Sequence, residues 1–202
     1  RLFDKKAFTR EIEYLGLDGS GLEAFRRAIH LPHGMILVSG PTGSGKTTTL
    51  YSALSEIKTV SKNLISVEDP IEYHIESVNQ VHANHKVGMT FARALRSILR
   101  QDPDIIMIGE IRDAETADIA VKSALTGHLM LSSVHANDPP GTVTRLIDMG
   151  VPRYLVGSAV ALVLAQRLVR RICERCKESY IADPEQLAPL GDDGALLAGR
   201  RL

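Results

Sequence analysis

The chain has 202 residues, of which 44% are apolar and 4% aromatic, and its 24 acidic residues balance its 24 lysines and arginines. This length and apolar content suit one sizeable α/β domain with at most a small appendage, and they exclude a disordered chain. The neutral net charge gives no general electrostatic attraction to nucleic acid, and the longest apolar run, residues 156–165, is about half of a membrane span.

The first predicted elements lead up to a glycine-rich loop. Residues 1–20 hold scattered apolar side chains and a turn-rich end, and the chain begins with Arg1 instead of Met. We therefore expect this stretch to be the tail or linker of a preceding domain. Helical spacing predicts a helix over 22–30, and an apolar run over 35–39 predicts a buried strand.

The segment after this strand has the pattern of a phosphate-binding P-loop. A strand, a glycine loop and a helix predicted over 47–58 aim backbone N–H groups and a helix dipole at one concavity. In such a loop Lys46 binds the β- and γ-phosphates and the Thr47 hydroxyl ligates Mg²⁺, while Gly43 and Gly45 adopt conformations that a Cβ forbids. The alternative is a turn that binds nothing. The predicted nucleotide-binding residues are Gly40, Pro41, Thr42, Gly43, Ser44, Gly45, Lys46, Thr47 and Thr48.

Further apolar runs alternate with predicted helices along the chain. Strands are expected over 64–67, 105–108 and 129–134, with helices over 91–100 and 113–125 between them. Such alternation predicts an α/β fold with a mainly parallel sheet that is covered on both sides. After Pro139-Pro140 two more helices are expected, over 143–149 and 154–170.

Chemically reactive side chains follow the later strands. Glu68 and Glu72 follow the second strand, Glu110 follows the third, and His135 follows the fourth. Ligands of open α/β sheets bind beyond the carboxyl ends of the strands, so these groups and the P-loop should meet at one edge. They are the groups that nucleoside-triphosphate hydrolysis requires. From the residues alone, either Glu68 or Glu72 faces the nucleotide, and His135 by itself is better explained as a structural histidine.

Four segments resemble, in order and spacing, the Walker A, Asp box, Walker B and His box of the secretion ATPase family. They are GPTGSGKTTTLY (40–51), VEDPIEY (67–73), ILRQDPDIIMIGEIRD (98–113) and TGHLMLSSVHAND (126–138). The resemblance covers residues 1 to 180 and favours the type II secretion members over the type IV pilus assembly members. It implies a RecA-like ATPase core over 21–140, a helical C-terminal part over 141–180, and a loop or truncated appendage over 181–202.

The resemblance also implies roles for single residues. Lys46 and Thr47 would bind phosphate and Mg²⁺, and Glu72 would activate water. Glu110, in place of the usual Asp, would be the Walker B acid and a Mg²⁺ ligand, and His135 would lie near the γ-phosphate with His128 as a lesser partner.

The family further implies partners and a location. The implied ligands are ATP and Mg²⁺, and the implied assembly is a homo-hexameric ring. The ring would contact platform and adaptor proteins and lie as a cytoplasmic, peripheral protein on the inner face of the bacterial inner membrane. The alternatives are a RecA-like nucleic-acid translocase, disfavoured by the low aromatic content and the lack of a basic stripe, and a nucleotide-binding scaffold without turnover.

Several arginines allow two interpretations. They either engage phosphate, within one subunit or across a subunit boundary, or pair with nearby aspartates. The arginines are Arg96, Arg100 and Arg112, and the aspartates are Asp102, Asp104 and Asp113. A later cluster, Arg167, Arg170, Arg171 and Arg175, is expected to be a solvated face.

The two cysteines, Cys173 and Cys176, form a C-x-x-C. In a nucleotide-binding cytosolic protein this spacing indicates metal or redox chemistry more than a structural disulfide. It resembles half of the tetracysteine zinc site of secretion and pilus assembly ATPases, so Zn²⁺ is implied for a full-length protein in which a second pair supplies the other two ligands. The alternative is a reduced, inert thiol pair.

Overall fold

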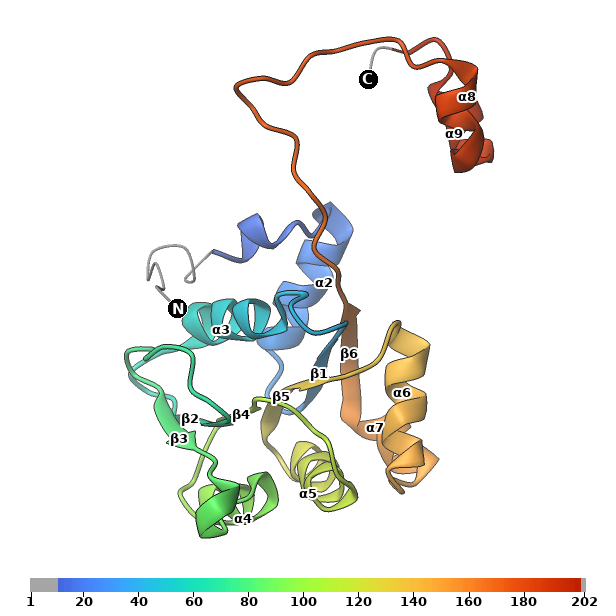
Figure 1. Ribbon diagram of the computed structural model, residues 1–202. Coiled ribbons are helices and arrows are strands. Elements are labelled where there is room, and N and C mark those ends of the chain that lie inside the picture. Colours follow the sequence, from blue (N-terminus) through green and yellow to red (C-terminus); the bar gives the residue numbers. More distant parts are fainter. Residues whose placement is uncertain (1–10, 201–202) are drawn as a thin grey trace. The chain divides into compact units, whose positions relative to one another are not determined.

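The computed structural model describes residues 11–200, and its strands form one six-stranded parallel sheet (Figure 1). The strand order is β3-β2-β4-β5-β1-β6, and every neighbouring pair is parallel. The α/β fold with a mainly parallel sheet is confirmed, and so are the four strands expected from the apolar runs. The strands are β1 Gly34–Ser39, β2 Leu64–Glu68, β3 Asn79–His82, β4 Ile105–Ile108, β5 Leu129–Val134 and β6 Val160–Ala165.

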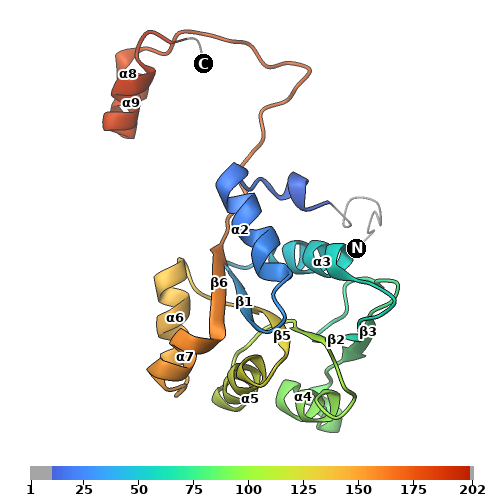
Figure 2. The same ribbon diagram turned by 180° about the vertical axis from the view of Figure 1, so that it is seen from behind.

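Helices cover both faces of this sheet (Figures 1 and 2). The helices α2 Gly19–Ile29 and α3 Lys46–Ile57 pack on one face, where Ile36 and Val38 of β1 point. The other face carries Met35 and Leu37 against a second set of helices. Because successive strand residues point to opposite faces, a strand buried on both sides is apolar throughout. The second set is α4 Phe91–Ile98, α5 Ala114–Leu125, α6 Pro139–Asp148 and α7 Arg153–Ala159.

Side-chain caps fix where several of these helices begin. The Asp113 carboxylate accepts from the backbone N of Thr116 at 2.8 Å, which starts α5. The Asp138 carboxylate accepts from the backbone N of Gly141 at 2.6 Å, which starts α6. Each cap accepts a hydrogen bond from a backbone amide that has no partner within the first helical turn. Asp113 lies in the segment after β4, and Asp138 lies in the segment after β5.

The prediction of one helix over 154–170 is wrong. Helix α7 ends at Ala159, and Val160–Ala165 forms β6, which pairs with β1. A short apolar run does not distinguish a buried strand from a helix. The open edge of β1 decides the outcome because its backbone groups need partners. The range 141–180 therefore holds most of α6, the short helix α7 and the sixth strand.

The edge strand β3 was not predicted from the sequence. Its residues Asn79 to His82 are mostly polar and half-exposed, so they lack the apolar run that marks the central strands. Near the N-terminus, residues 1–10 of the expected tail lie outside the described residues. The remainder includes the 3-10 helix η1 Ile12–Leu15, whose Ile12 is buried with the side chains of α2 and α3.

The chain divides into two compact units, the first ending at Leu168 and the second beginning at Val169. The second unit contains α8 Pro184–Leu187, the 3-10 helix η3 Ala188–Leu190 and α9 Asp192–Leu197. The expected loop or appendage over 181–202 is thus partly helical, and its residues 201–202 lie outside the described part. Over residues 11–200, none of the helices has both the length and the apolar character needed to cross a membrane.

Candidate active site

The P-loop connects the end of β1 to the start of α3. Gly43 and Gly45 have φ angles of 79° and 89°, which confirms the expected left-handed backbone. The Lys46 Nζ donates hydrogen bonds to the carbonyls of Gly40 and Pro41, each at 2.9 Å. Burial lowers the pKa of Lys46, and the Glu110 carboxylate acts in the opposite direction. The lysine is therefore a partly desolvated cation held inside the loop.

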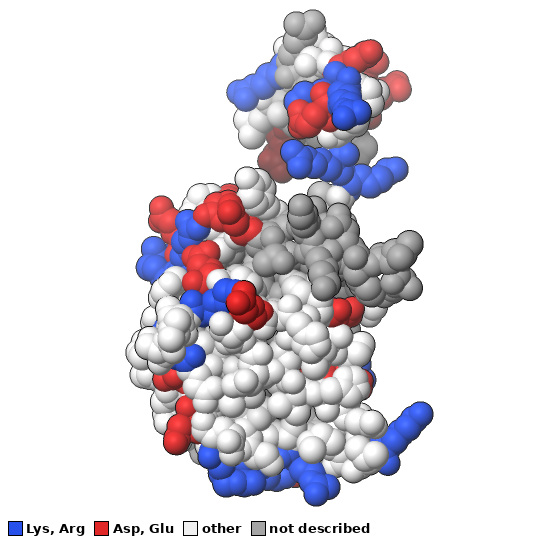
Figure 3. All heavy atoms as spheres, turned by 90° about the vertical axis from the view of Figure 1, so that its left-hand side faces the viewer, with Lys and Arg blue, Asp and Glu red and all other residues white. Residues whose placement is uncertain are grey.

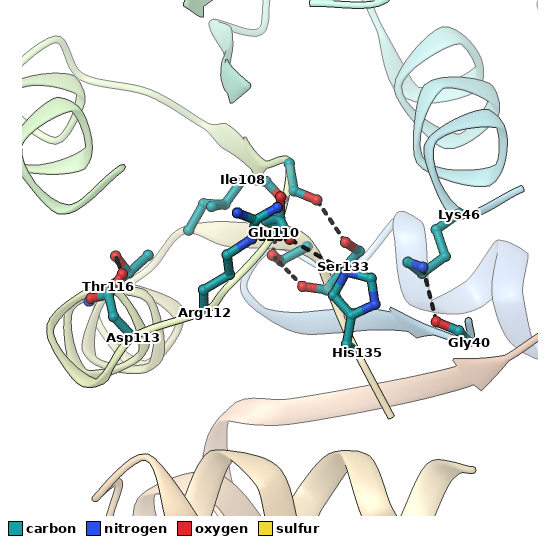
Figure 4. Close-up of polar contacts among 11 residues, drawn as sticks. Gly40, Lys46, Ile108, Glu110, Arg112, Asp113, Thr116, Ser133 and His135 are labelled. Carbon is teal, nitrogen blue, oxygen red and sulfur yellow. Dashed lines mark hydrogen bonds and ion pairs between the residues drawn. The ribbon is translucent and has the colours of Figure 1, made fainter. Parts of the chain in front are cut away.

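Glu110 and His135 meet beside the P-loop. The His135 Nε2 lies 3.4 Å from the Glu110 Oε2, and the Arg112 guanidinium pairs with the same oxygen. This ion pair raises the pKa of Arg112. Figure 4 shows the His135 ring between Glu110 and Lys46. The expected meeting of the P-loop with the groups that follow β4 and β5 is thus seen for Lys46, Glu110 and His135.

The strand order explains this convergence. Strands β4, β5 and β1 are adjacent and parallel, so their carboxyl ends lie side by side. Cross-links fix the segment after β4, because the Ser133 Oγ donates to the Gly109 carbonyl at 2.7 Å and the Ile111 N donates to the Ser133 carbonyl at 3.0 Å. Glu110 is held between these two contacts, and only 13% of its side chain is exposed.

The two acids after β2 lie in different surroundings. Glu68 is 3% exposed, and its carboxylate accepts hydrogen bonds from Ser66 Oγ at 2.6 Å, from Gln80 Nε2 at 3.0 Å and from the Tyr51 hydroxyl. Glu72 lies in the following loop and is half-buried. The Glu68 carboxylate is thus engaged by three donors inside the protein, and Glu72 is the more exposed of the two acids.

Gln166 is a site residue that the sequence reasoning missed. It directly follows β6, and its backbone N donates to the Ser39 carbonyl at 2.9 Å. Its side-chain Nε2 donates to the Ser44 carbonyl at 2.7 Å, and its Oε1 accepts from the Thr49 hydroxyl at 2.8 Å. One amide thus braces both the P-loop and the first turn of α3. The sequence feature that could have indicated Gln166 is the apolar run over 160–165 with a polar side chain directly after it.

His128 does not join the site. It precedes β5, and its Nδ1 lies 3.2 Å from the Ser123 carbonyl. His135 follows the other end of the same strand. A six-residue strand spans about 20 Å, so the expectation that His128 partners His135 is wrong.

Arg96 and Arg112 pair with glutamates and not with the expected aspartates. Arg96 bonds Glu115 at 2.6 Å, which ties α4 to α5, and Arg112 pairs with Glu110. Asp113 is used as the cap of α5. Asp104 accepts from the backbone N of Asn63 at 2.7 Å.

Cys173 and Cys176 are exposed free thiols in the second unit. Hydrogen bonds from the Arg175 backbone and from Cys176 lower the pKa of Cys173. Within residues 11–200, no three His, Cys, Asp or Glu side chains gather where they could hold a metal ion. The two thiols therefore do not by themselves make the four-ligand site that zinc requires.

Comparison with known proteins places these features in a family context. A family model described as "Type II/IV secretion system protein" matches residues 1–195. The "Type II secretion system protein E" of Pseudomonas aeruginosa is 53% identical over 195 residues, which are 96% of this chain and 39% of that protein. The "Type IV pilus assembly ATPase PilB" of Myxococcus xanthus is 56% identical over 178 residues, which are 88% of this chain and 31% of that protein.

A solved structure has the same fold. The crystal structure of the pilus retraction motor PilT with bound ADP matches with a TM-score of 0.76 at 36% identity, and the match covers 86% of this chain and 52% of that one. The expected secretion-ATPase fold is confirmed. The chain spans less than two fifths of the length of the two curated relatives, at 39% and 31%.

Proposed function

This chain belongs to the type II/IV secretion system protein family, and we propose that it carries the ATP-hydrolysing core of a motor for type II protein secretion. The observation that carries the proposal is the meeting of Lys46, Glu110 and His135 at one sheet edge. A cation in a P-loop with an acid beside it fits the binding of phosphates and Mg²⁺ in phosphoryl transfer to water, and the imidazole adds a polar group next to them. The 53% identity to a type II secretion protein E supports the choice of system.

Each site residue has a proposed role. The P-loop amides and Lys46 bind the triphosphate, helped by the positive end of the α3 dipole. Thr47 and Glu110 fit as ligands of Mg²⁺, which neutralises phosphate charge when bound. Glu72 accepts a proton from the attacking water, and His135 contacts the γ-phosphate. Because His135 also touches Glu110 at 3.4 Å, loss of that phosphate can be sensed at the Walker B acid.

The proposal includes an assembly and a place in the cell. We propose a homo-hexameric ring, because ATP bound at a subunit boundary can draw neighbouring subunits together. The ring would lie on the cytoplasmic face of the inner membrane, peripherally, and act on platform and adaptor proteins. Zinc would bind to Cys173 and Cys176 only where two further ligands come from outside residues 11–200.

Type IV pilus assembly is the second candidate, favoured by the 56% identity to PilB of Myxococcus xanthus. A nucleic-acid translocase finds less support. On the face of the first unit seen in Figure 3, acidic and basic side chains are interspersed along the left side, a broad central area carries no charge, and basic side chains gather at the lower edge. No basic stripe crosses the centre of this face, where a nucleic-acid backbone would need one.

The first test uses the full-length protein and a deletion strain. We expect phosphate release from ATP that requires Mg²⁺, and we expect the gene to restore protein secretion in a strain that lacks its type II secretion ATPase. Restored piliation in a pilus assembly mutant, without restored secretion, would favour the second candidate. Tight DNA binding that weakens steeply with added salt would contradict both.

The Gln166 brace leads to a second prediction. Gln166→Ala removes two neutral hydrogen bonds that hold the P-loop, each worth about 1 kcal/mol, so ATP affinity should fall roughly tenfold through lost preorganisation. Titration calorimetry with a non-hydrolysable ATP analogue measures the change. The matched control is Gln101→Ala, because Gln101 is an exposed glutamine that follows α4, away from the P-loop. Equal affinities of the two variants would contradict a role for the brace.

A further inference from the structure

The loop that carries Glu72 must be held in place for the proposed chemistry. Residues 69–78 connect β2 to the edge strand β3 and contain no helix or strand. Loops are usually the more mobile parts of a protein. A catalytic base that is displaced by about 1 Å loses much of its effect. The proposed chemistry therefore requires contacts that fix this loop relative to the P-loop.

Gln80 connects two backbone positions of this loop with the end of β2. Its Oε1 accepts from the Ile75 backbone N at 2.8 Å, and its Nε2 donates to the Tyr73 carbonyl at 3.2 Å. The same Nε2 donates to Glu68 Oε1 at 3.0 Å. One side-chain amide thus holds the loop backbone at two points and anchors it on the last residue of β2.

Tyr51 extends this anchor to the P-loop helix. It lies on α3, five residues after Lys46, and is 0% exposed. Its hydroxyl donates to Glu68 Oε2 and accepts from the Glu72 backbone N at 3.4 Å. Its ring packs edge-to-face on Tyr73, with ring centroids 4.7 Å apart. The helix that begins at Lys46 therefore contacts the loop at Glu72 itself.

Glu68 is the centre of this network. It is 3% exposed and receives three donors, from Tyr51, Gln80 and Ser66. A buried carboxylate is tolerated when such donors satisfy it. Burial, together with the hydrogen bond to Glu68, raises the pKa of Tyr51. The tyrosine hydroxyl consequently keeps its proton at neutral pH and remains a donor.

We propose that Tyr51, Glu68 and Gln80 are positioning residues that fix Glu72 relative to the P-loop helix. The proposal rests on the proposed function, in which Glu72 activates water. None of the three touches ATP or water in this assignment; they act through Glu72. Nucleotide binding at the start of α3 and the placement of Glu72 are then mechanically linked, because Tyr51 lies on one element and contacts the other.

The test compares Tyr51→Phe with wild type in the full-length protein. The ring and its packing remain, and only the hydroxyl is lost. We expect kcat to fall about tenfold, the effect of misplacing a general base by a fraction of an ångström, while KM for ATP changes less than about twofold. Tyr154→Phe is the matched control, since Tyr154 is 73% exposed on α7, and its kcat should equal that of wild type.

A double variant separates positioning from a general loss of structure. If Tyr51 acts through Glu72, Tyr51→Phe should have no further effect on the residual turnover of Glu72→Gln. An equal fall of kcat in both backgrounds would overturn the proposal. If Tyr51→Phe does not fold, Gln80→Met removes the loop tie with similar side-chain volume and should give the same pattern.

The outcomes distinguish this proposal from the proposed function. A Tyr51→Phe protein with wild-type kcat, beside an impaired Glu72→Gln, overturns the positioning role alone. Wild-type kcat in Glu72→Gln overturns the assigned role of Glu72 and the positioning role with it. A fall in kcat for Tyr51→Phe that vanishes in the Glu72→Gln background supports both.

Discussion

Lys46→Ala is expected to abolish ATP binding and turnover. The Lys46 ammonium is the cation of the P-loop, and it is already drawn into the loop by the carbonyls of Gly40 and Pro41 at 2.9 Å. Removing it deletes the charge that the β- and γ-phosphates would meet, in a place where burial weakens solvent screening. Loss of a single preorganised donor to developing charge costs about 100-fold or more in kcat.

Phosphate release and calorimetric titration with an ATP analogue measure this effect in the full-length protein. Lys122→Ala is the matched control, because Lys122 is a surface lysine on α5 that pairs with Asp118 at 2.7 Å. It should bind and hydrolyse ATP normally. Circular dichroism establishes that both variants are folded. Undiminished turnover in Lys46→Ala would refute the P-loop assignment.

Glu72→Gln is expected to leave ATP binding largely intact and to reduce hydrolysis strongly. The amide has nearly the same shape as the carboxylate but cannot accept the proton of water, and general-base catalysis contributes about 100- to 10,000-fold to rate. Steady-state phosphate release at saturating ATP gives kcat, and analogue titration gives affinity. Glu76→Gln is the control in the same loop, since Glu76 is exposed.

Glu68→Gln should behave differently from Glu72→Gln. It replaces an acceptor oxygen by an NH₂ group among three donors, and a mismatched buried polar group costs about 1–3 kcal/mol. The expected result is a lower unfolding temperature, with the loss of activity following from loosened packing. A stable Glu68→Gln protein without turnover, beside normal turnover in Glu72→Gln, would mean that Glu68 is the base.

Local patterns in the sequence predicted the P-loop well. The glycine φ angles, the strand before the loop and the helix after it all depend on contiguous residues between 34 and 57. The meeting of Glu110 and His135 with this loop also followed from the sequence, because alternating strands and helices predict a parallel sheet whose carboxyl ends share one edge.

Contacts between distant segments could not be predicted in this way. Gln166 and Thr49 are 117 positions apart, and their contact exists only because β6 pairs with β1. The apolar run that forms β6 suits a helix equally well. The role of His128 came from the resemblance alone, although the strand predicted over 129–134 already separates His128 from His135.

The glycine-rich loop, the fold class and the family could be predicted from the sequence, because they depend on local backbone requirements and on motif spacing. The surroundings of single acids, in contrast, depend on the folded chain. Glu68 and Glu72 are four positions apart and of the same type, and only the donors from Tyr51 and Gln80 show that the first is engaged in the interior. Burial and hydrogen bonding are properties of neighbours brought together by folding, and they separate two acids that the sequence leaves equivalent.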